Sequence, residues 1–354
     1  MRTETAFLAY VRRRRRELLR PGTPAEAAEE ALALLGLDDA ALTRWAESDS
    51  VLVSLPHASP NVFDPRTRVG WYAGVVQRRE TNPAHHVRVV LTHINFSDLG
   101  WRPYAWWYLG EDGTVRCHRQ FSRNKKRKHV TVGSQPPMEH EPEHAAPADR
   151  DAARVARWGA DLGVSYMLVG AVIERAAGMV SSPTVTYLPL DLLVSFVQEH
   201  AAQPASTADA GDRHLRAWCR LLTEQAQGRR TGPDGILVEC PAHRATVFDN
   251  YSNLAMLPLL GDCRVLGGAK MAGYWPHVQE RLDALRPAAA EDMGDPRVVV
   301  VPEVDLLRAA GPSPAVAAQL ERLGVPYSQG LAVAEHGDFA ARIDPFPHDG
   351  AAAG

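Results

Sequence analysis

The pattern of apolar and polar positions over residues 51–95 predicts a strand, a loop, a helix and a second strand. Residues 51–55 are an apolar run that ends at Pro56, and residues 87–94 are a second run rich in β-branched side chains. Between these runs, apolar residues recur at helical spacing. This order is typical of the β-α-β unit of a parallel sheet. Because such sheets bind ligands beyond the carboxyl ends of their strands, the loop after Leu55 is the first candidate site.

The remaining pattern extends this unit to an α/β fold. Residues 1–50 are helical in pattern and form an N-terminal helical segment. Residues 51–200 are predicted to form a Rossmann-like α/β domain, whose parallel or mixed sheet carries helices on both faces. Residues 201–211 are the best linker candidate. Residues 212–350 again alternate strands and helices, either as a separate domain or as the completion of the first sheet.

Composition narrows the classes of protein that the chain can belong to. Its 354 residues are 45% apolar, enough to fill a large core, and its net charge of −3 means that nucleic-acid binding must come from a local patch. The four cysteines are far apart and form no CxxC motif, so we expect reduced thiols. We see neither a secretory signal pattern nor an apolar run of about eighteen residues, and we expect a cytoplasmic protein.

A hairpin with aromatic residues and a basic run stand out after the first β-α-β unit. Asp112-Gly113 lies between two β-rich runs, which is a strong hairpin signal, and Trp106 and Trp107 belong to the first run. Five basic residues follow within residues 123–128. Stacking rings beside positive charge are typical of RNA-binding surfaces. The alternative is that the rings are the buried face of the hairpin and the basic run is a solvated loop.

Two pieces of the chain carry a resemblance to a known family. In residues 51–94 a strand leads into a Ser-containing loop, a helix and a second strand that ends in Thr-His-Ile. In residues 163–187, Tyr166 leads through an apolar segment to Tyr187. Together they resemble the tRNA-dependent cyclodipeptide synthases, enzymes with a Rossmann-like fold related to the catalytic domains of class I aminoacyl-tRNA synthetases.

The resemblance implies roles for particular residues. The serine that takes the aminoacyl group from the first tRNA would correspond to Ser54, with Ser59 as the alternative, and the helix tyrosine would correspond to Tyr166. The family's glutamate four residues further on is replaced by Gly170, and Glu174 follows one turn later. The Gly-x-Ser arrangement of the family is also absent.

We therefore expect an acyltransferase that moves an aminoacyl or similar group from an activated ester, such as aminoacyl-tRNA, to a small acceptor in biosynthesis. No cofactor and no metal are expected, and tRNA would bind through the local basic patch. The expected catalytic residues are Ser54, Ser59, Tyr166 and Glu174. The expected substrate-binding residues are His57, Asn61, Arg123, Lys125, Lys126, Arg127 and Lys128.

Two alternative functions remain open at the level of sequence. The first is a hydrolase of a small amide or ester, in a zinc-dependent form with His93 and His129 as ligands, because residues 91–115 also have the strand and hairpin rhythm of zinc-dependent cell-wall amidases. In that family a Tyr-His pair lies in the hairpin, where this chain has Ala105-Trp106. The second is a non-catalytic RNA-binding module that uses the hairpin and two basic runs, Arg12 to Arg16 and the run within residues 123–128.

Overall fold

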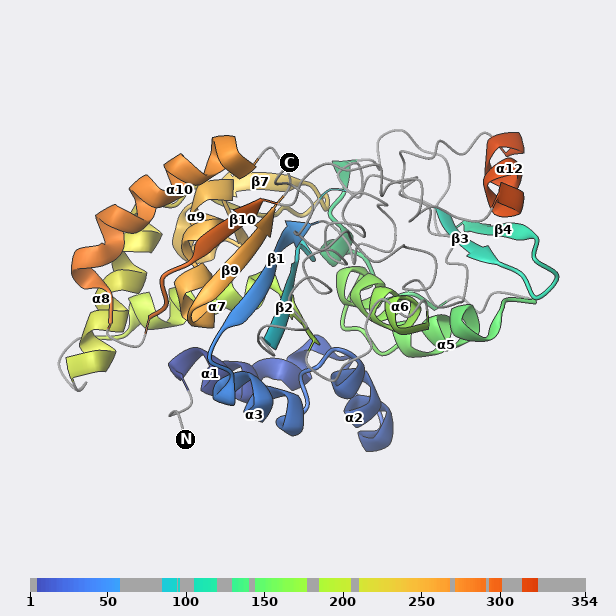
Figure 1. Ribbon diagram of the computed structural model, residues 1–354, viewed down its shortest axis with the longest axis horizontal. Coiled ribbons are helices and arrows are strands. Elements are labelled where there is room, and N and C mark those ends of the chain that lie inside the picture. Colours follow the sequence, from blue (N-terminus) through green and yellow to red (C-terminus); the bar gives the residue numbers. More distant parts are fainter. Residues whose placement is uncertain are drawn as a thin grey trace, which may run out of the picture.

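A parallel sheet of five strands forms the centre of the molecule. The computed structural model describes residues 5–57, 85–93, 95, 105–119, 129–139, 144–176, 185–204, 210–267, 271–290, 293–300 and 314–323. The strands of the sheet are β1 (Val51–His57), β2 (His85–Val90), β5 (Val185–Pro189), β9 (Cys263–Gly267) and β10 (Arg297–Val300). They lie in the order β10-β9-β1-β2-β5 (Figure 1).

This strand order is that of a Rossmann-like fold. Along the chain, β1, β2 and β5 follow one another toward one edge of the sheet, and β9 and β10 then extend it from the other side of β1. The direction of sheet building therefore reverses between β1 and β9, and ligands of α/β sheets bind at such a switch point. The predicted α/β class is confirmed, and strands from both halves of the chain pair in one sheet.

The described helices flank this sheet and two smaller sheets, which are described below (Figure 1). The predicted N-terminal segment is helical, and strands and helices alternate in the described part of residues 212–350, as predicted. The α-helices are α1 (Ala6–Arg14), α2 (Ala25–Leu34), α3 (Asp39–Glu47), α5 (Pro147–Ala156), α6 (Leu162–Ala176), α7 (Leu190–Ala202), α8 (Ala210–Gln225), α9 (Asn250–Ala255), α10 (Met271–Leu285) and α12 (Pro314–Arg322).

Helices cover both faces of the sheet, as the side chains of β2 demonstrate. His85 stacks on Trp45 of α3, with ring centroids 5.4 Å apart. Arg88 lies three residues further along the strand and so points to the opposite face, where it pairs with Glu174 of α6. All six residues of β2 are buried, as expected for a parallel strand that is covered on both sides.

The N-terminal helical segment closes the edge of the sheet at β5. The backbone N–H of Tyr187 donates to the carbonyl of Leu35 at 2.8 Å, and the Thr186 hydroxyl donates to the carbonyl of Gly36 at 2.8 Å. Donors used in this way are not available to pair with another chain. Gly36 has a φ of 64°, and a Cβ at this position would overlap the carbonyl oxygen of Val185.

We expect Gly36→Ala to lower the free energy of unfolding by about 2 kcal/mol or more, since it adds a backbone clash to the cost of a left-handed residue. Gly22 is the matched control, because its φ is 83° but a Cβ there would meet nothing within 4 Å. Gly22→Ala should cost only about 1–2 kcal/mol. Urea denaturation of the two variants measures the difference, and equal losses would contradict the close approach at Gly36.

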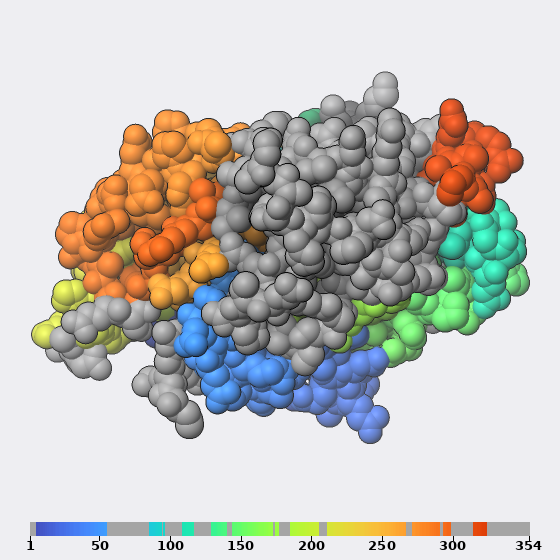
Figure 2. All heavy atoms as spheres, in the orientation of Figure 1, coloured from blue at the N-terminus to red at the C-terminus, as the bar shows by residue number. Residues whose placement is uncertain are grey.

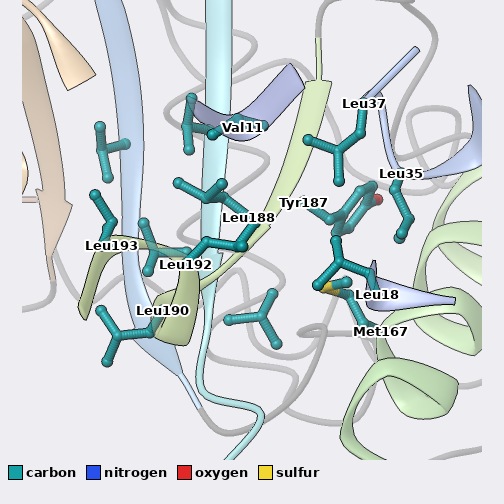
Figure 3. Packing of buried hydrophobic residues seen from close by; sticks show 14 of the residues in the cluster. Val11, Leu18, Leu35, Leu37, Met167, Tyr187, Leu188, Leu190, Leu192 and Leu193 are labelled. Carbon is teal, nitrogen blue, oxygen red and sulfur yellow. The ribbon is translucent and has the colours of Figure 1, made fainter. Parts of the chain in front are cut away.

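Apolar residues from distant parts of the chain form the core beside this edge. Figure 3 shows Tyr187 among Leu18, Leu35, Leu37 and Met167, which come from the N-terminal segment and from α6. These side chains are fully or almost fully buried. Burial of a side chain of this size contributes about 1.5–3 kcal/mol, so the N-terminal segment belongs to the core of the α/β domain.

The hairpin predicted at Asp112-Gly113 is confirmed. Strands β3 (Ala105–Leu109) and β4 (Val115–Arg119) pair in antiparallel fashion, and Gly113 in the turn has a φ of 72°. Helix α12 lies against this hairpin (Figures 1 and 2), where the Gln319 side chain accepts from the N–H of Val115 at 2.8 Å and donates to the carbonyl of Gly113 at 2.9 Å. Near the C-terminus the chain therefore returns to the hairpin.

A small antiparallel sheet lies beside the parallel one, in the order β7-β6-β8. Its strands belong to residues 212–350, for which the sequence predicts alternating strands and helices. Gln198 of α7 donates to the carbonyls of Ala242 and Ala245 at 2.6 and 2.8 Å, which fixes this sheet to the main body. The strands are β6 (Gly228–Thr231), β7 (Leu237–Cys240) and β8 (Val247–Phe248).

Among the described residues, no helix is long and apolar enough to cross a membrane. Cys219, Cys240 and Cys263 are free thiols. Burial raises the pKa of Cys219 and of Cys263, so neither is an activated nucleophile.

Candidate functional site

Ser54, Arg88 and Tyr187 lie side by side in a row across β1, β2 and β5. In the strand register, Ser54 is the partner of Arg88, and Arg88 is the partner of Tyr187. Partners on parallel strands project to the same face, which here is the face that α6 covers. On its other side Ser54 is the partner of Leu266 in β9. The serine therefore stands at the switch point of the sheet.

Glu174 of α6 holds two members of this row. The guanidinium of Arg88 and the phenol of Tyr187 both donate to Oε2 of Glu174, the phenol at 2.5 Å. The guanidinium carbon of Arg88 is also 5.7 Å from the centroid of the Tyr187 ring. All three residues are buried, and removal of one charged partner would leave the other uncompensated. Separating Arg88 from Glu174 is therefore strongly unfavourable.

Burial also fixes the protonation of Tyr187 in this row and of Tyr166 on α6. It raises the pKa of Tyr187 well above the ordinary value, and the negative charge of Glu174 raises it further. Burial alone raises the pKa of Tyr166. Both side chains are therefore neutral phenols at physiological pH, and each offers one O–H donor rather than a phenolate.

The structure describes three of the four predicted catalytic residues, and its contacts connect two of them, Ser54 and Glu174. Ser54 is 6% exposed, Tyr166 is 2% exposed and Glu174 is fully buried. Tyr166 and Glu174 lie two turns apart on α6, with Gly170 between them. Glu174 is linked to Ser54 by way of Arg88, which pairs with Glu174 and neighbours Ser54 in the sheet.

The other predicted site residues are not placed. His57 is the last residue of β1, but its side chain lies outside the described residues. The remaining ones also lie outside the described residues, and they are Ser59, Asn61, Arg123, Lys125, Lys126, Arg127 and Lys128.

No protein-family model matches this chain, and no curated protein matches it significantly.

A second group of polar side chains lies at the carboxyl ends of β2 and β5. The Thr92 hydroxyl donates to Asp191, in the first turn of α7, at 2.7 Å. Asp161 accepts from the N–H of Val164 at 3.0 Å and so caps the start of α6. Burial raises the pKa of Asp161 to about 6; Asp191 adds to this rise, and the nearby His93 opposes it. This edge of the sheet therefore holds a carboxyl group that can exchange a proton near neutral pH.

Neither Arg88 nor Asp161 was identified from the sequence. Arg88 had a usable signal, since it is the charged residue of the strand sequence HHVRVV. A strand of this kind in a parallel sheet is covered on both faces, so an arginine inside it needs a buried partner. Asp161 precedes α6 and resembles any helix cap in the sequence.

No three His, Cys, Asp or Glu side chains come together as metal ligands in the part of the chain that the structure describes. His93, a ligand in the zinc-dependent alternative, has its Nδ1 atom buried against Gly133 without a hydrogen-bond partner among these residues.

Proposed function

We propose that this protein is an acyltransferase that takes an aminoacyl group from aminoacyl-tRNA and transfers it to a small amine acceptor. The observation that carries the proposal is the row at the switch point, in which Ser54 neighbours an arginine that Glu174 and Tyr187 hold in place. A hydroxyl beside a fixed guanidinium suits attack on an ester carbonyl, because guanidinium N–H groups can donate to the carbonyl oxygen as negative charge develops on it.

The reaction divides into two transfers. In the first, the Ser54 oxygen attacks the ester carbonyl, the bond to the ribose oxygen breaks, and the serine proton passes to the departing ribose hydroxyl. In the second, the acceptor amine attacks the acyl-serine, an amide forms, and one amine proton returns to Ser54. The ester of aminoacyl-tRNA is activated already, so the two steps need no further energy source.

The low exposure of Ser54 bears on the lifetime of an acyl-serine and not on its formation. An acyl-serine at a position that is 6% exposed is shielded from bulk water, which would otherwise hydrolyse the intermediate. Ser59, in the loop that the sequence predicts after residue 55, is the alternative acyl acceptor. The predicted basic run at residues 123–128 would supply contacts to tRNA phosphates.

The test is incubation of the full chain with a panel of aminoacyl-tRNAs that carry radiolabelled amino acids, followed by acid precipitation and ribonuclease treatment. We expect label to remain on the wild-type protein and on Ser48→Ala, and to be lost in Ser54→Ala. Ser48 is a matched control because its hydroxyl donates to the carbonyl of Arg44 within α3, away from the row.

The outcomes separate the parts of the proposal. Loss of label in Ser59→Ala instead of Ser54→Ala would move the acyl group to the loop serine. Label that survives both changes would contradict a serine intermediate. Failure of every aminoacyl-tRNA to transfer its amino acid, with or without added small amines, would contradict the function itself.

A further inference from the structure

The small antiparallel sheet carries three exposed arginines that form no ion pair with a carboxylate in the described part of the chain. Arg229 and Arg230 are exposed on β6, and Arg244 is exposed just after β7. Within the described residues none of the three guanidinium groups has an ion pair or a hydrogen bond, although Glu239 is the cross-strand partner of Arg229. Arg230 and Arg244 both lie close enough to Cys240 to oppose the rise that burial causes in the pKa of its thiol. Arg230 and Arg244 therefore lie in one positive region, and Arg229 adds a positive charge on the other face of β6.

The arginines of the N-terminal segment are different. Arg14 pairs with Glu17 at 3.0 Å, Arg20 pairs with Glu139 at 3.0 Å, and Arg16 pairs with Glu29. A guanidinium that is already bonded to a carboxylate has fewer donors left for a phosphate. The basic run of residues 12–16 is therefore a charge-balanced helix surface, whereas the arginines of the small sheet remain available.

One segment, which contains Thr131, connects the small sheet to the parallel sheet. It contacts the turn between β6 and β7 on one side and a residue that follows β2 on the other. Thr131 forms a bridge with Asn95, which follows β2. The Thr131 N–H donates to the carbonyl of Gly235 at 2.7 Å, and its hydroxyl lies 3.0 Å from that of Thr231, the residue after Arg230. The chain enters this segment directly from the predicted basic run of residues 123–128. Arg230 thus lies next to a residue that contacts this segment, and the segment directly follows residues 123–128 in the sequence.

We propose that Arg229, Arg230 and Arg244 form a surface that binds the phosphate backbone of the tRNA substrate. This proposal rests on the proposed function and adds the binding surface to it. Arg229 and Arg230 are adjacent in a strand and point to opposite faces, so they do not converge on one small anion. An extended polyanion can contact both, and a guanidinium binds phosphate oxygens in a bidentate way.

The experiment compares two triple variants with the same change of net charge. Arg229→Ala, Arg230→Ala and Arg244→Ala remove the unpaired arginines, whereas Arg14→Ala, Arg16→Ala and Arg20→Ala remove the paired ones. Binding of uncharged bulk tRNA is measured by filter retention at several salt concentrations, and circular dichroism checks that both variants fold.

We expect the first triple variant to bind tRNA about 10- to 100-fold more weakly than the wild type near physiological salt, with a salt slope smaller by about 2–3. The control triple variant should bind as the wild type does. An unchanged Kd and slope in the first variant, or an equal loss in both variants, would overturn the proposal. Binding of the wild type to anionic vesicles but not to tRNA would also overturn it.

A single-turnover measurement keeps this proposal separate from the function on which it rests. If the first triple variant binds tRNA normally while the wild type becomes acylated at Ser54, the surface is wrong and the function stands. If the arginines prove necessary for tRNA binding but no acyl group is transferred, the surface stands and the function is wrong.

Discussion

Arg88→Met should lower the free energy of unfolding by about 3–5 kcal/mol, because it leaves the carboxylate of Glu174 buried without its guanidinium partner. A loss of this size is a large part of the total stability of an ordinary domain, about 5–15 kcal/mol. Urea denaturation followed by far-UV circular dichroism measures it. Arg154→Met is the matched control, since Arg154 pairs with Glu30 at the exposed surface, and it should cost no more than about 1 kcal/mol.

A double variant tests the cause of this loss. Arg88→Met combined with Glu174→Met removes both charges, so its loss should be smaller than the sum of the two single losses. Additive losses would mean that the two side chains do not stabilise each other. A loss below about 1 kcal/mol in Arg88→Met would contradict the buried pair itself.

The second large effect is expected on acidification, through His85. This histidine is fully buried, and burial, which is the largest cause, lowers its pKa to about 3, with further contributions from His86 and Arg44. Its Nε2 lies 2.9 Å from the Thr186 hydroxyl, which donates its own proton to Gly36, so Nε2–H is the donor and the ring is neutral. Protonation would add a proton at Nδ1, which is buried and has no partner among the described residues.

The direction of the effect follows from the difference between the two states. An unfolded histidine takes up a proton near pH 6.5, whereas the folded one does so only near pH 3, so the unfolded chain binds more protons between these values. The contribution of His85 is complete above pH 6.5 and is lost as the pH falls, by about 2 kcal/mol between pH 7 and pH 5.

His85→Gln isolates this contribution, since glutamine can still donate to Thr186 but does not titrate. We expect the stability difference between the wild type and His85→Gln to shrink by about 2 kcal/mol from pH 7 to pH 5, as measured by urea denaturation at each pH. A difference that stays constant over this range would show that His85 titrates alike in both states.

Local sequence signals predicted much of the fold. The apolar runs gave β1 and most of β2, although β2 begins at His85 and ends at Val90 rather than at Ile94, which lies outside the described residues. The Asp-Gly turn marked the β3–β4 hairpin. Strand β6 was missed because Gly-Arg-Arg-Thr has no apolar pattern, and its conformation depends on pairing with β7 and β8 on its two sides.

The candidate site was harder to predict, because it depends on register. Ser54 and Glu174 were named from a resemblance, but nothing local in the sequence indicates that Arg88 lies beside Ser54. A shift of one residue in the pairing of β1 and β2 would place these side chains on opposite faces. Register is set by packing across the whole sheet, which includes β9 from the other half of the chain.

The position of β1 between β2 and β9 also affects how the protein folds during synthesis. Val51 is the partner of Cys263, so at about 5–20 residues per second the ribosome needs about 10–40 s to make the roughly 210 residues between them. During that time one side of β1 has no native partner, and its unpaired backbone N–H and C=O groups are available to other nascent chains. We therefore expect the yield of native protein to depend on chaperones that bind unpaired strands until β9 is made.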